Sequence, residues 1–227
     1  MTEITDHLAE IRNRVARAAA RSGRARDAIR IVAVSKAQSI ASIAEAHAAG
    51  QLDFGESYVQ ESLPKILALQ GTDIVWHFIG HLQANKTRAV AEQFQWAHTV
   101  DRERIAARLN DQRPHFAPPL NVLIQVNQTG EAQKAGVAPS EVEPLARAIA
   151  RLPRLALRGL MTIPPADADP ARTAGLFEQL AAQRAELAAA GIAMDTLSMG
   201  MSDDFELAIE AGATCVRIGT AIFGGRN

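Results

Sequence analysis

Residues 31–50 read IVAVSKAQSIASIAEAHAAG, and this stretch holds one strand followed by one helix. The apolar, β-branched run at 31–34 is short, as expected for a buried strand. After it, apolar residues recur at helical spacing through Ile43 and Ala48, and the pattern stops at Gly50. The stretch therefore predicts one β-then-α unit.

Further strand candidates follow along the chain, and each but the last precedes a helical pattern. They are Leu52–Phe54, Val75–Ile79, Trp96–Val100, Val122–Val126, Leu157–Ile163, Thr196–Met199 and Cys215–Ile218. Spacings of roughly 20–40 residues suit crossover connections between parallel strands and not hairpins. Eight such units in about 250 residues predict an α/β fold, a (β/α)8 TIM barrel.

The opening segment predicts an extra helix before the barrel, because apolar residues recur every three or four positions from Ile4 to Ala18 and Gly23 follows. No Gly/Ser-rich linker divides the chain, and the proline cluster at 114–119 falls between a helix and a strand. We therefore expect a single domain over residues 1–227.

A doubly wound open sheet is the main structural alternative, since it also alternates strands and helices. Its glycine loop is missing from the sequence. The turn after the first strand reads VAVSKAQS, with neither G-x-G-x-x-G nor the Walker motif. Dinucleotide binding and Walker-type phosphate binding therefore both lose support.

The charge balance argues against a nucleic-acid partner. Lys plus Arg number 24 against 25 Asp plus Glu, which gives a formal net charge of -1. The single cysteine, Cys215, cannot form an internal disulfide, and no Cys/His cluster offers a metal site. We expect a reducing compartment and no metal.

The sequence also argues against a membrane location. No apolar stretch approaches the roughly 18 residues of a membrane helix. Acidic residues such as Glu3 and Asp6 interrupt the start of the chain, unlike a signal or transit peptide. A cytoplasmic protein without membrane partners is expected. The balanced charge and the lack of a long apolar stripe outside the barrel helices favour a monomer.

Lys36 ends the first strand, directly after the run IVAVS at 31–35, where a barrel would place it at the C-terminal mouth. Desolvation by apolar walls lowers the pKa of a lysine and exposes a neutral amine, as Schiff-base formation with a carbonyl compound requires. The alternative is a surface lysine in a loop. Position alone leaves both open.

The motif VRIGTAIFGG, which contains the last strand, predicts an anion site. Backbone N–H groups around Gly219 and the hydroxyl of Thr220 are suitable donors, and barrels commonly bind phosphate after strands seven and eight. Ser202, after the seventh strand, adds another hydroxyl to this site. Ser202 is equally suited to cap the helix that runs from Phe205 to Ala211, and both roles are compatible because a cap position is also an anion site.

Arg217 is a charged residue between two apolar ones in this last strand, and it shares a face with Gly219. A buried cation needs a partner. The partner is either a structural carboxylate or a bound ligand, and spacing leaves the two alternatives open.

Four long motifs occur in one order along the chain. They are AVSK at Ala33–Lys36, FGESYVQE at Phe54–Glu61, WHFIGHLQANK at Trp76–Lys86, and SMGMSDD at Ser198–Asp204 together with VRIGTAIFG at Val216–Gly224. In order and spacing they resemble the pyridoxal 5′-phosphate homeostasis protein family, which is similar to the barrel domain of bacterial alanine racemase. The resemblance covers essentially the whole chain.

The resemblance implies a site for pyridoxal 5′-phosphate. In the family, the residue at the position of Lys36 forms a Schiff base with this cofactor, and the residue matching Arg217 faces its pyridine nitrogen. The phosphate is surrounded by the residues that match Met201, Ser202, Gly219 and Thr220. Lys134 matches a lysine near the site mouth and is a secondary candidate beside the alternative of a solvated lysine.

The family resemblance also implies a role in homeostasis of the cofactor, by buffering it or delivering it to apo-enzymes, without a dedicated catalytic reaction. Racemisation needs acid/base groups on two faces of the cofactor, and the racemase family takes its second group, a tyrosine, from an additional β domain. This chain leaves no residues for such a domain, and its only tyrosine, Tyr58, starts a helix. The alternative is a racemase-like enzyme acting on small amino acids, with His81 or water as the second base.

Two positions depart from the family pattern. Ser57 stands where asparagine is common, and Ala84 stands where serine is common. Neither matches a residue of the cofactor site, so we expect these departures to affect fine tuning and not cofactor binding.

Overall fold

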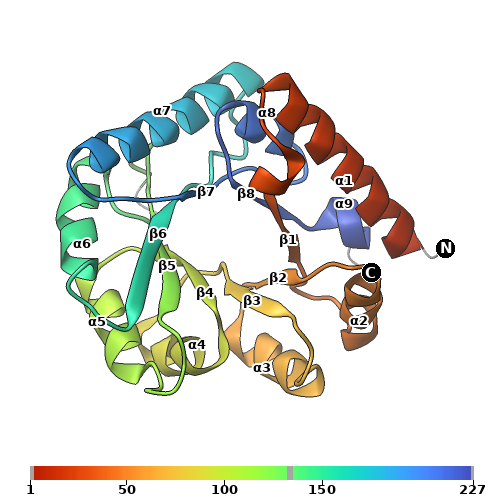
Figure 1. Ribbon diagram of the computed structural model, residues 1–227, viewed down its shortest axis with the longest axis horizontal. Helices are drawn as coiled ribbons and strands as arrows, with labels where there is room; N and C mark the ends of the chain where they lie inside the picture. The colour runs from red at the N-terminus through yellow and green to blue at the C-terminus, as the bar shows by residue number, and fades with distance from the viewer. Residues whose placement is uncertain (1–2, 132–134, 226–227) are drawn as a thin grey trace.

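The computed structural model describes residues 3–131 and 135–225. Its strands close into a parallel barrel in the chain order β1-β2-β3-β4-β5-β6-β7-β8, with the helices outside (Figure 1). The strands are β1 (Arg30–Val34), β2 (Asp53–Glu56), β3 (Val75–Phe78), β4 (Trp96–Val100), β5 (Leu120–Gln125), β6 (Leu155–Met161), β7 (Thr196–Ser198) and β8 (Cys215–Ile218). The prediction of a (β/α)8 TIM barrel is confirmed.

The strand ends differ from the sequence prediction by one or two residues. Strands β5 and β6 each begin two residues earlier, because Leu120 pairs with Leu155 at their first position. Strand β6 ends at Met161, and Pro164 and Pro165 follow shortly after. A proline lacks the N–H that a central strand needs, so the pairing stops before this pair.

The helices cover the outside of the barrel (Figure 1). They are α1 (Glu3–Arg21), α2 (Ile40–Ala48), α3 (Val59–Ala68), α4 (Thr87–Gln93), α5 (Glu103–Gln112), α6 (Val142–Ile149), α7 (Pro170–Ala189), α8 (Phe205–Glu210) and α9 (Thr220–Phe223), with short 3₁₀ turns η1 (Arg26–Ala28), η2 (Ala84–Lys86) and η3 (Pro139–Glu141). Within the described ranges, no helix has the length and apolar character that crossing a membrane requires.

Helix α1 is the extra N-terminal helix predicted from the sequence. Its apolar stripe, which includes Leu8, Ile11 and Val15, is buried. The helix packs against α2, α8 and α9 and so joins the two ends of the barrel sequence (Figure 1). Arg14 pairs with Glu206 of α8 at 3.2 Å, which fixes this contact at its edge.

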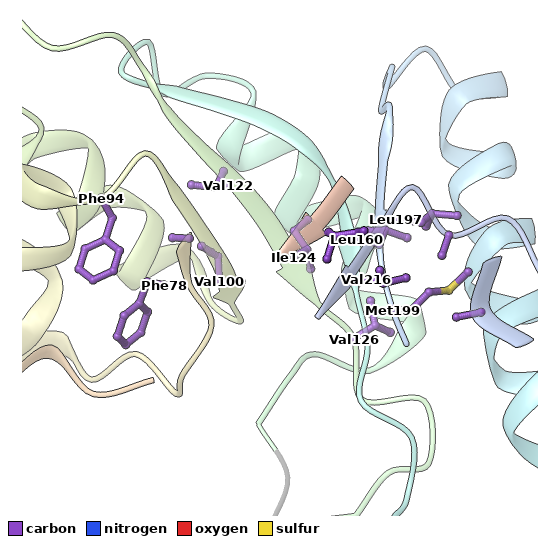
Figure 2. Packing of buried hydrophobic residues seen from close by; sticks show 14 of the residues in the cluster. Phe78, Phe94, Val100, Val122, Ile124, Val126, Leu160, Leu197, Met199 and Val216 are labelled. Atoms are coloured by element: carbon purple, nitrogen blue, oxygen red, sulfur yellow. The ribbon is translucent and has the colours of Figure 1, made fainter. Parts of the chain in front are cut away.

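The main core lies between the strands and the helices. Figure 2 shows Ile124 and Leu160 packed side by side there, and Phe78 of β3 lying next to Phe94, which follows α4. The two phenyl rings are 5.6 Å apart at 82°, an edge-to-face contact. Burial of this layer supplies the main hydrophobic stabilisation of the fold.

The barrel interior is different, because it combines a small apolar cluster with polar groups. The apolar cluster is Trp96, Leu123 and Met161. Beside it, His77 and His98 are fully buried. Barrel interiors are usually filled by layers of branched apolar side chains, so this polar content calls for hydrogen-bond partners.

Candidate functional site

An open pocket of about 220 Å³ lies where β1, β7 and β8 end. Its lining residues are Val34, Lys36, Gln38, Met201, Ser202, Asp203, Arg217, Gly219, Thr220 and Gly224. The structure therefore brings together all six candidate residues of the sequence analysis, although 165 positions separate Lys36 from Met201 in the chain.

Lys36 is half-buried and follows β1 by two residues. Side chains alternate between the two faces of a strand, so Lys36 continues the face of Val34. Both residues line the pocket. The lysine is therefore aimed into the barrel mouth and not outward as a surface lysine.

The backbone immediately after Lys36 is strained. Ala37 has φ 60, in the left-handed region that residues other than glycine rarely adopt. Its N–H donates a short hydrogen bond to the carboxylate of Glu61 in α3. This bond compensates part of a backbone cost of roughly 1–2 kcal/mol.

A buried ionic cluster stands behind Lys36, between the barrel wall and α3. The amine of Lys65 donates to the carbonyl oxygen of Ser35 at 2.9 Å, to Glu56 Oε1 at 2.9 Å and to Glu61 Oε1 at 2.6 Å. Three bonds use every donor of an ammonium group. The cluster thereby anchors the backbone on both sides of Lys36. The carbonyl group of Ser35, before it, accepts from Lys65, and the N–H group of Ala37, after it, donates to Glu61.

Burial controls the titration of this cluster. Burial raises the pKa of Glu56, and the hydrogen bonds from Ser35 and Lys65 only partly oppose it. Burial also raises the pKa of Glu61, but the bonds from Lys65 and the Ala37 N–H outweigh it and leave that pKa below its ordinary value. The sequence analysis missed this cluster. The sequence did contain one indication of this cluster. Glu61 and Lys65 are four positions apart, a spacing that places an ion pair on one helix face.

Two hydroxyl groups meet on the other side of the pocket. Thr220 Oγ1 donates to Ser202 Oγ at 3.2 Å. The alternative of Ser202 as a helix cap is wrong, because Asp204 occupies the N-cap position of α8. Thr220 begins α9, and the first N–H groups of a helix have no acceptor within the helix. Hydroxyl and backbone donors therefore gather here.

The turn that carries Ser202 depends on a glycine. Gly200 has φ +91, and a Cβ at this position would come within 2.8 Å of the Phe205 Cα. The N–H of Met201 donates to Asp204 Oδ1 at 2.6 Å, which closes the turn. Burial raises the pKa of Asp204 against this bond. Met201 is left exposed at the pocket rim.

Arg217 lies at the inner end of the pocket and is only 4% exposed. Its Nη1 donates to Ser198 Oγ at 2.7 Å, and its Nη2 donates to the carbonyl oxygen of Thr162 at 3.0 Å. Burial lowers its pKa. Both acceptors are neutral, so the described residues do not give this cation a direct ion pair, and a ligand remains the open alternative.

The residues considered as a second base lie elsewhere. The side chain of His81 is 51% exposed and its Nδ1 is 4.0 Å from Asp101 Oδ2, whose carboxyl pKa is raised by burial. Tyr58 is 63% exposed and makes no capping hydrogen bond at the start of α3. Neither residue lines the pocket. Lys134 falls outside the residues that the structure describes.

Among the described residues, the other metal- or redox-capable groups offer no second site. Cys215 is a buried free cysteine in β8, and burial raises the pKa of its thiol to about 11. Such a thiol is a poor nucleophile. In the described part of the chain, no group of three His, Cys, Asp or Glu side chains is arranged to hold a metal ion.

Comparisons with known proteins agree on one family. A sequence profile described as "Alanine racemase, N-terminal domain" matches residues 7–227. The pyridoxal phosphate homeostasis protein of Escherichia coli (strain K12) is 52% identical over 230 residues, which cover 100% of this chain and 98% of that protein.

Solved structures agree with the sequence relatives. PipY of Synechococcus elongatus PCC7942, solved without PLP, has 36% identity and a TM-score of 0.88, and the match covers 97% of this chain and 100% of PipY. PipY with PLP bound gives 35% identity and a TM-score of 0.85, with the same coverage. Alanine racemase from Corynebacterium glutamicum shares the fold, at 18% identity and a TM-score of 0.71, over 97% of this chain and 62% of that enzyme.

Proposed function

The chain belongs to the alanine racemase N-terminal domain family and, within it, to the pyridoxal phosphate homeostasis proteins, and from this premise we propose that it binds pyridoxal 5′-phosphate (PLP) in the pocket beside Lys36. In the proposed bound state, the Lys36 amine is joined to the PLP aldehyde as a Schiff base. The protein then buffers PLP and delivers it to apo-enzymes. PipY, solved with PLP bound, supports this ligand.

The polar groups of the pocket fit PLP, which carries a phosphate, an aldehyde and a pyridine nitrogen. Lys36 supplies an amine, and Ser202 and Thr220 supply hydroxyl donors next to the first N–H groups of α9. Arg217 supplies a buried cation. This single donor set around one pocket is the observation that carries the proposal. The proposed cofactor-binding residues are Lys36, Met201, Ser202, Arg217, Gly219 and Thr220.

Each residue would have a distinct role. Ser202, Thr220 and the backbone at Gly219 bind the phosphate, and Met201 covers the open side. Arg217 faces the ring nitrogen and, as a donor without acceptor capacity, leaves that nitrogen unprotonated. When bound, PLP supplies an electron sink for amino-acid chemistry, and an unprotonated ring nitrogen weakens it.

A carrier role is favoured over a racemase-like enzyme because the two candidates for a second base lie outside the pocket. Racemisation needs a second acid/base group over the cofactor, and neither Tyr58 nor His81 lines the pocket. The relatives named pyridoxal phosphate homeostasis proteins support a role other than a committed reaction. A Schiff base with no committed substrate can pass its aldehyde to another amine, as delivery requires.

The proposal also covers organisation and location. We propose a single domain over residues 1–227 that acts as a monomer in the cytoplasm, without a nucleic-acid or membrane partner. A formal net charge of -1 and a free, buried Cys215 support this view. Sedimentation at several protein concentrations tests the monomer, and a mass that doubles with concentration would contradict it.

The site is tested by visible absorption of the protein with added PLP, followed by borohydride reduction and peptide mapping. The chain has only four lysines, Lys36, Lys65, Lys86 and Lys134, so the reduced adduct maps without ambiguity. We expect a visible band and an adduct on Lys36 in the wild type and in the control Lys86→Arg, and neither in Lys36→Ala. An adduct on another lysine, or no band in any protein, would remove the proposed site.

The carrier role is tested separately with the loaded protein. We expect transfer of PLP to an apo-enzyme and no exchange of the α-proton of added amino acids in deuterated water. Rapid α-proton exchange that disappears in Lys36→Ala would favour the racemase-like enzyme.

A further inference from the structure

An unbroken run of hydrogen bonds crosses the barrel interior behind the pocket. It begins with Arg217 Nη1, which is 2.7 Å from Ser198 Oγ, and continues with Ser198 Oγ, which is 2.9 Å from His98 Nδ1. His98 Nε2 is 2.9 Å from His77 Nδ1, and His77 Nε2 is 2.8 Å from Asp53 Oδ1. We refer to Asp53, His77, His98, Ser198 and Arg217 as the barrel relay.

The barrel relay spans the barrel from one end to the other. Asp53 is the first residue of β2, at the opposite end from the pocket, and Arg217 lines the pocket itself. His77, His98 and Ser198 are fully buried between them, each on a different strand. Interior positions of this kind normally carry branched apolar side chains. A polar column here therefore calls for a reason other than core packing.

With both imidazole rings neutral, the two ends of the relay set the direction of every hydrogen bond. A guanidinium only donates and an ionised carboxylate only accepts, whereas a neutral imidazole donates through one nitrogen and accepts through the other. His77 then donates from Nε2 to Asp53 and accepts at Nδ1 from His98. His98 accepts at its own Nδ1 from the Ser198 hydroxyl, which in turn accepts from Arg217. Each ring carries its single proton on Nε2.

The electrostatics of the relay agree with this assignment. Burial lowers the pKa of His77 against the opposing bond to Asp53, and burial lowers the pKa of His98 well below its ordinary value. Burial raises the pKa of Asp53, but the hydrogen bond from His77 and the bond and charge of Arg30 oppose it, and that pKa is lowered overall. A carboxylate and two neutral rings follow.

The far end of the relay is itself supported. Arg30 donates to Asp53 Oδ1, and its guanidinium lies 5.2 Å from the ring centre of Trp96. The ring of His77 stacks on the same indole at 5.4 Å. Arg30 and His77 therefore both bond to the carboxylate of Asp53, and both pack against the Trp96 indole. These contacts orient the carboxylate toward the barrel interior.

We propose that Asp53, His77, His98 and Ser198 are positioning residues that orient Arg217 toward the ligand in the pocket. Nη1 donates one hydrogen bond to Ser198 and Nη2 donates one to the Thr162 carbonyl oxygen. The other N–H groups of the guanidinium are left for the ligand. The ligand's identity as PLP rests on the proposed function, whereas the relay itself does not.

A relay of neutral groups has one advantage over a direct ion pair at Arg217. A carboxylate in contact with Arg217 would occupy its donors and cancel the positive charge beneath an anionic ligand. Asp53 is paired with Arg30 at the far end of the relay, and the charged or titratable groups that act on Arg217 are Asp204 and the thiol of Cys215. The pocket therefore keeps both its cation and the N–H donors that a ligand would use.

The first test reads the tautomers directly in the full-length protein freed of PLP. Histidine labelled with ¹⁵N distinguishes the ring nitrogens by NMR. Near neutral pH we expect His77 and His98 to be neutral, each with its proton on Nε2. A proton on Nδ1, or a charged ring, at either histidine would overturn the relay whether or not the protein binds PLP.

The second test measures PLP dissociation and the position of the visible band in variants. His98→Leu breaks the relay, and we expect PLP binding at least about tenfold weaker and a shifted band. Ser198→Ala, a smaller change that serves if His98→Leu does not fold, should act in the same direction. His98→Gln keeps one acceptor and one donor in the side chain and should restore most of the affinity and the wild-type band.

Leu123→Ala is the matched control, because Leu123 is buried in the same interior but makes no side-chain hydrogen bond. It should lower stability and leave the band unmoved. A wild-type band and affinity in both His98→Leu and Ser198→Ala, or a Leu123→Ala variant that changes them equally, would overturn the positioning role. Absence of PLP binding in the wild type would instead remove the proposed function, and the tautomers alone would then decide the relay.

Discussion

Replacing Lys65 by methionine tests the buried cluster that anchors Lys36. Glu56 is fully buried, and Lys65 is the only cation that bonds to it within the described residues. Methionine keeps much of the apolar stem and removes the charge. Because the change leaves a buried carboxylate without a counter-charge, we expect the free energy of unfolding to fall by about 3–5 kcal/mol.

Urea denaturation near neutral pH measures this loss, and the double variant Lys65→Met/Glu56→Gln identifies its cause. Glutamine removes the uncompensated charge and still accepts from Ser35, so we expect at least half of the loss to be recovered. Glu61→Gln is the control for the half-buried partner of Lys65. The Glu61 side chain is 32% exposed, and we expect a loss of only about 1 kcal/mol.

The pH dependence supplies an independent check. The folded-state pKa of Glu56 is already raised by burial, and the loss of Lys65 raises it further. The folded variant then holds a proton that the unfolded chain releases above about pH 4.3. Its deficit against wild type should therefore shrink as the pH falls from neutral toward that value. A Lys65→Met protein within about 1 kcal/mol of wild type, with a deficit that does not change with pH, would refute the reasoning.

Two further predictions concern the strained residue and the buried histidines. Ala37→Gly removes a left-handed backbone strain of roughly 1–2 kcal/mol and costs roughly 0.5–1 kcal/mol of backbone entropy. Urea denaturation should therefore show a free energy of unfolding that is higher by about 0.5–1 kcal/mol. A lower free energy of unfolding would contradict the strain. Burial lowers the pKa of His98, so the unfolded state binds more protons below about pH 6.5 and wild-type stability should fall there by up to about 1.4 kcal/mol per pH unit for this residue. His98→Gln should show a shallower acid slope, and equal slopes would contradict a neutral buried ring.

The sequence was sufficient for the barrel and for part of the pocket lining, for a physical reason. Strand and helix periods are local patterns, and the rule that loops at the C-terminal ends of barrel strands meet at one face brings distant motifs together. Lys36 and Thr220 could be placed at one mouth in this way. Ser202 was left between two interpretations, because the exact start of α8 decides between a cap and a pocket residue.

The partners of the buried polar residues could not be predicted in the same way. His98 and Ser198 lie 100 positions apart, and their hydrogen bond depends on which side chains share a layer of the barrel interior. The available signal was a histidine inside a largely apolar strand, as in VWHF and WAHTV. That pattern shows that a partner is needed without showing which one.

The two polar systems lie on opposite sides of the same barrel wall, and this separation follows from the alternation of strands. Val34 pairs with Gly55, and both lie on the inner face of the wall. The next residues on the two strands, Ser35 and Glu56, therefore lie on the outer face toward α3. Lys36 comes one position later and returns to the inner face of Val34. The buried ionic cluster, on the outer side of the wall, holds the backbone of Lys36. The barrel relay, on the inner side, holds the guanidinium of Arg217. Neither system places a carboxylate in contact with the amine or the guanidinium. The Lys36 amine and the remaining N–H groups of Arg217 are therefore left as donors for a ligand.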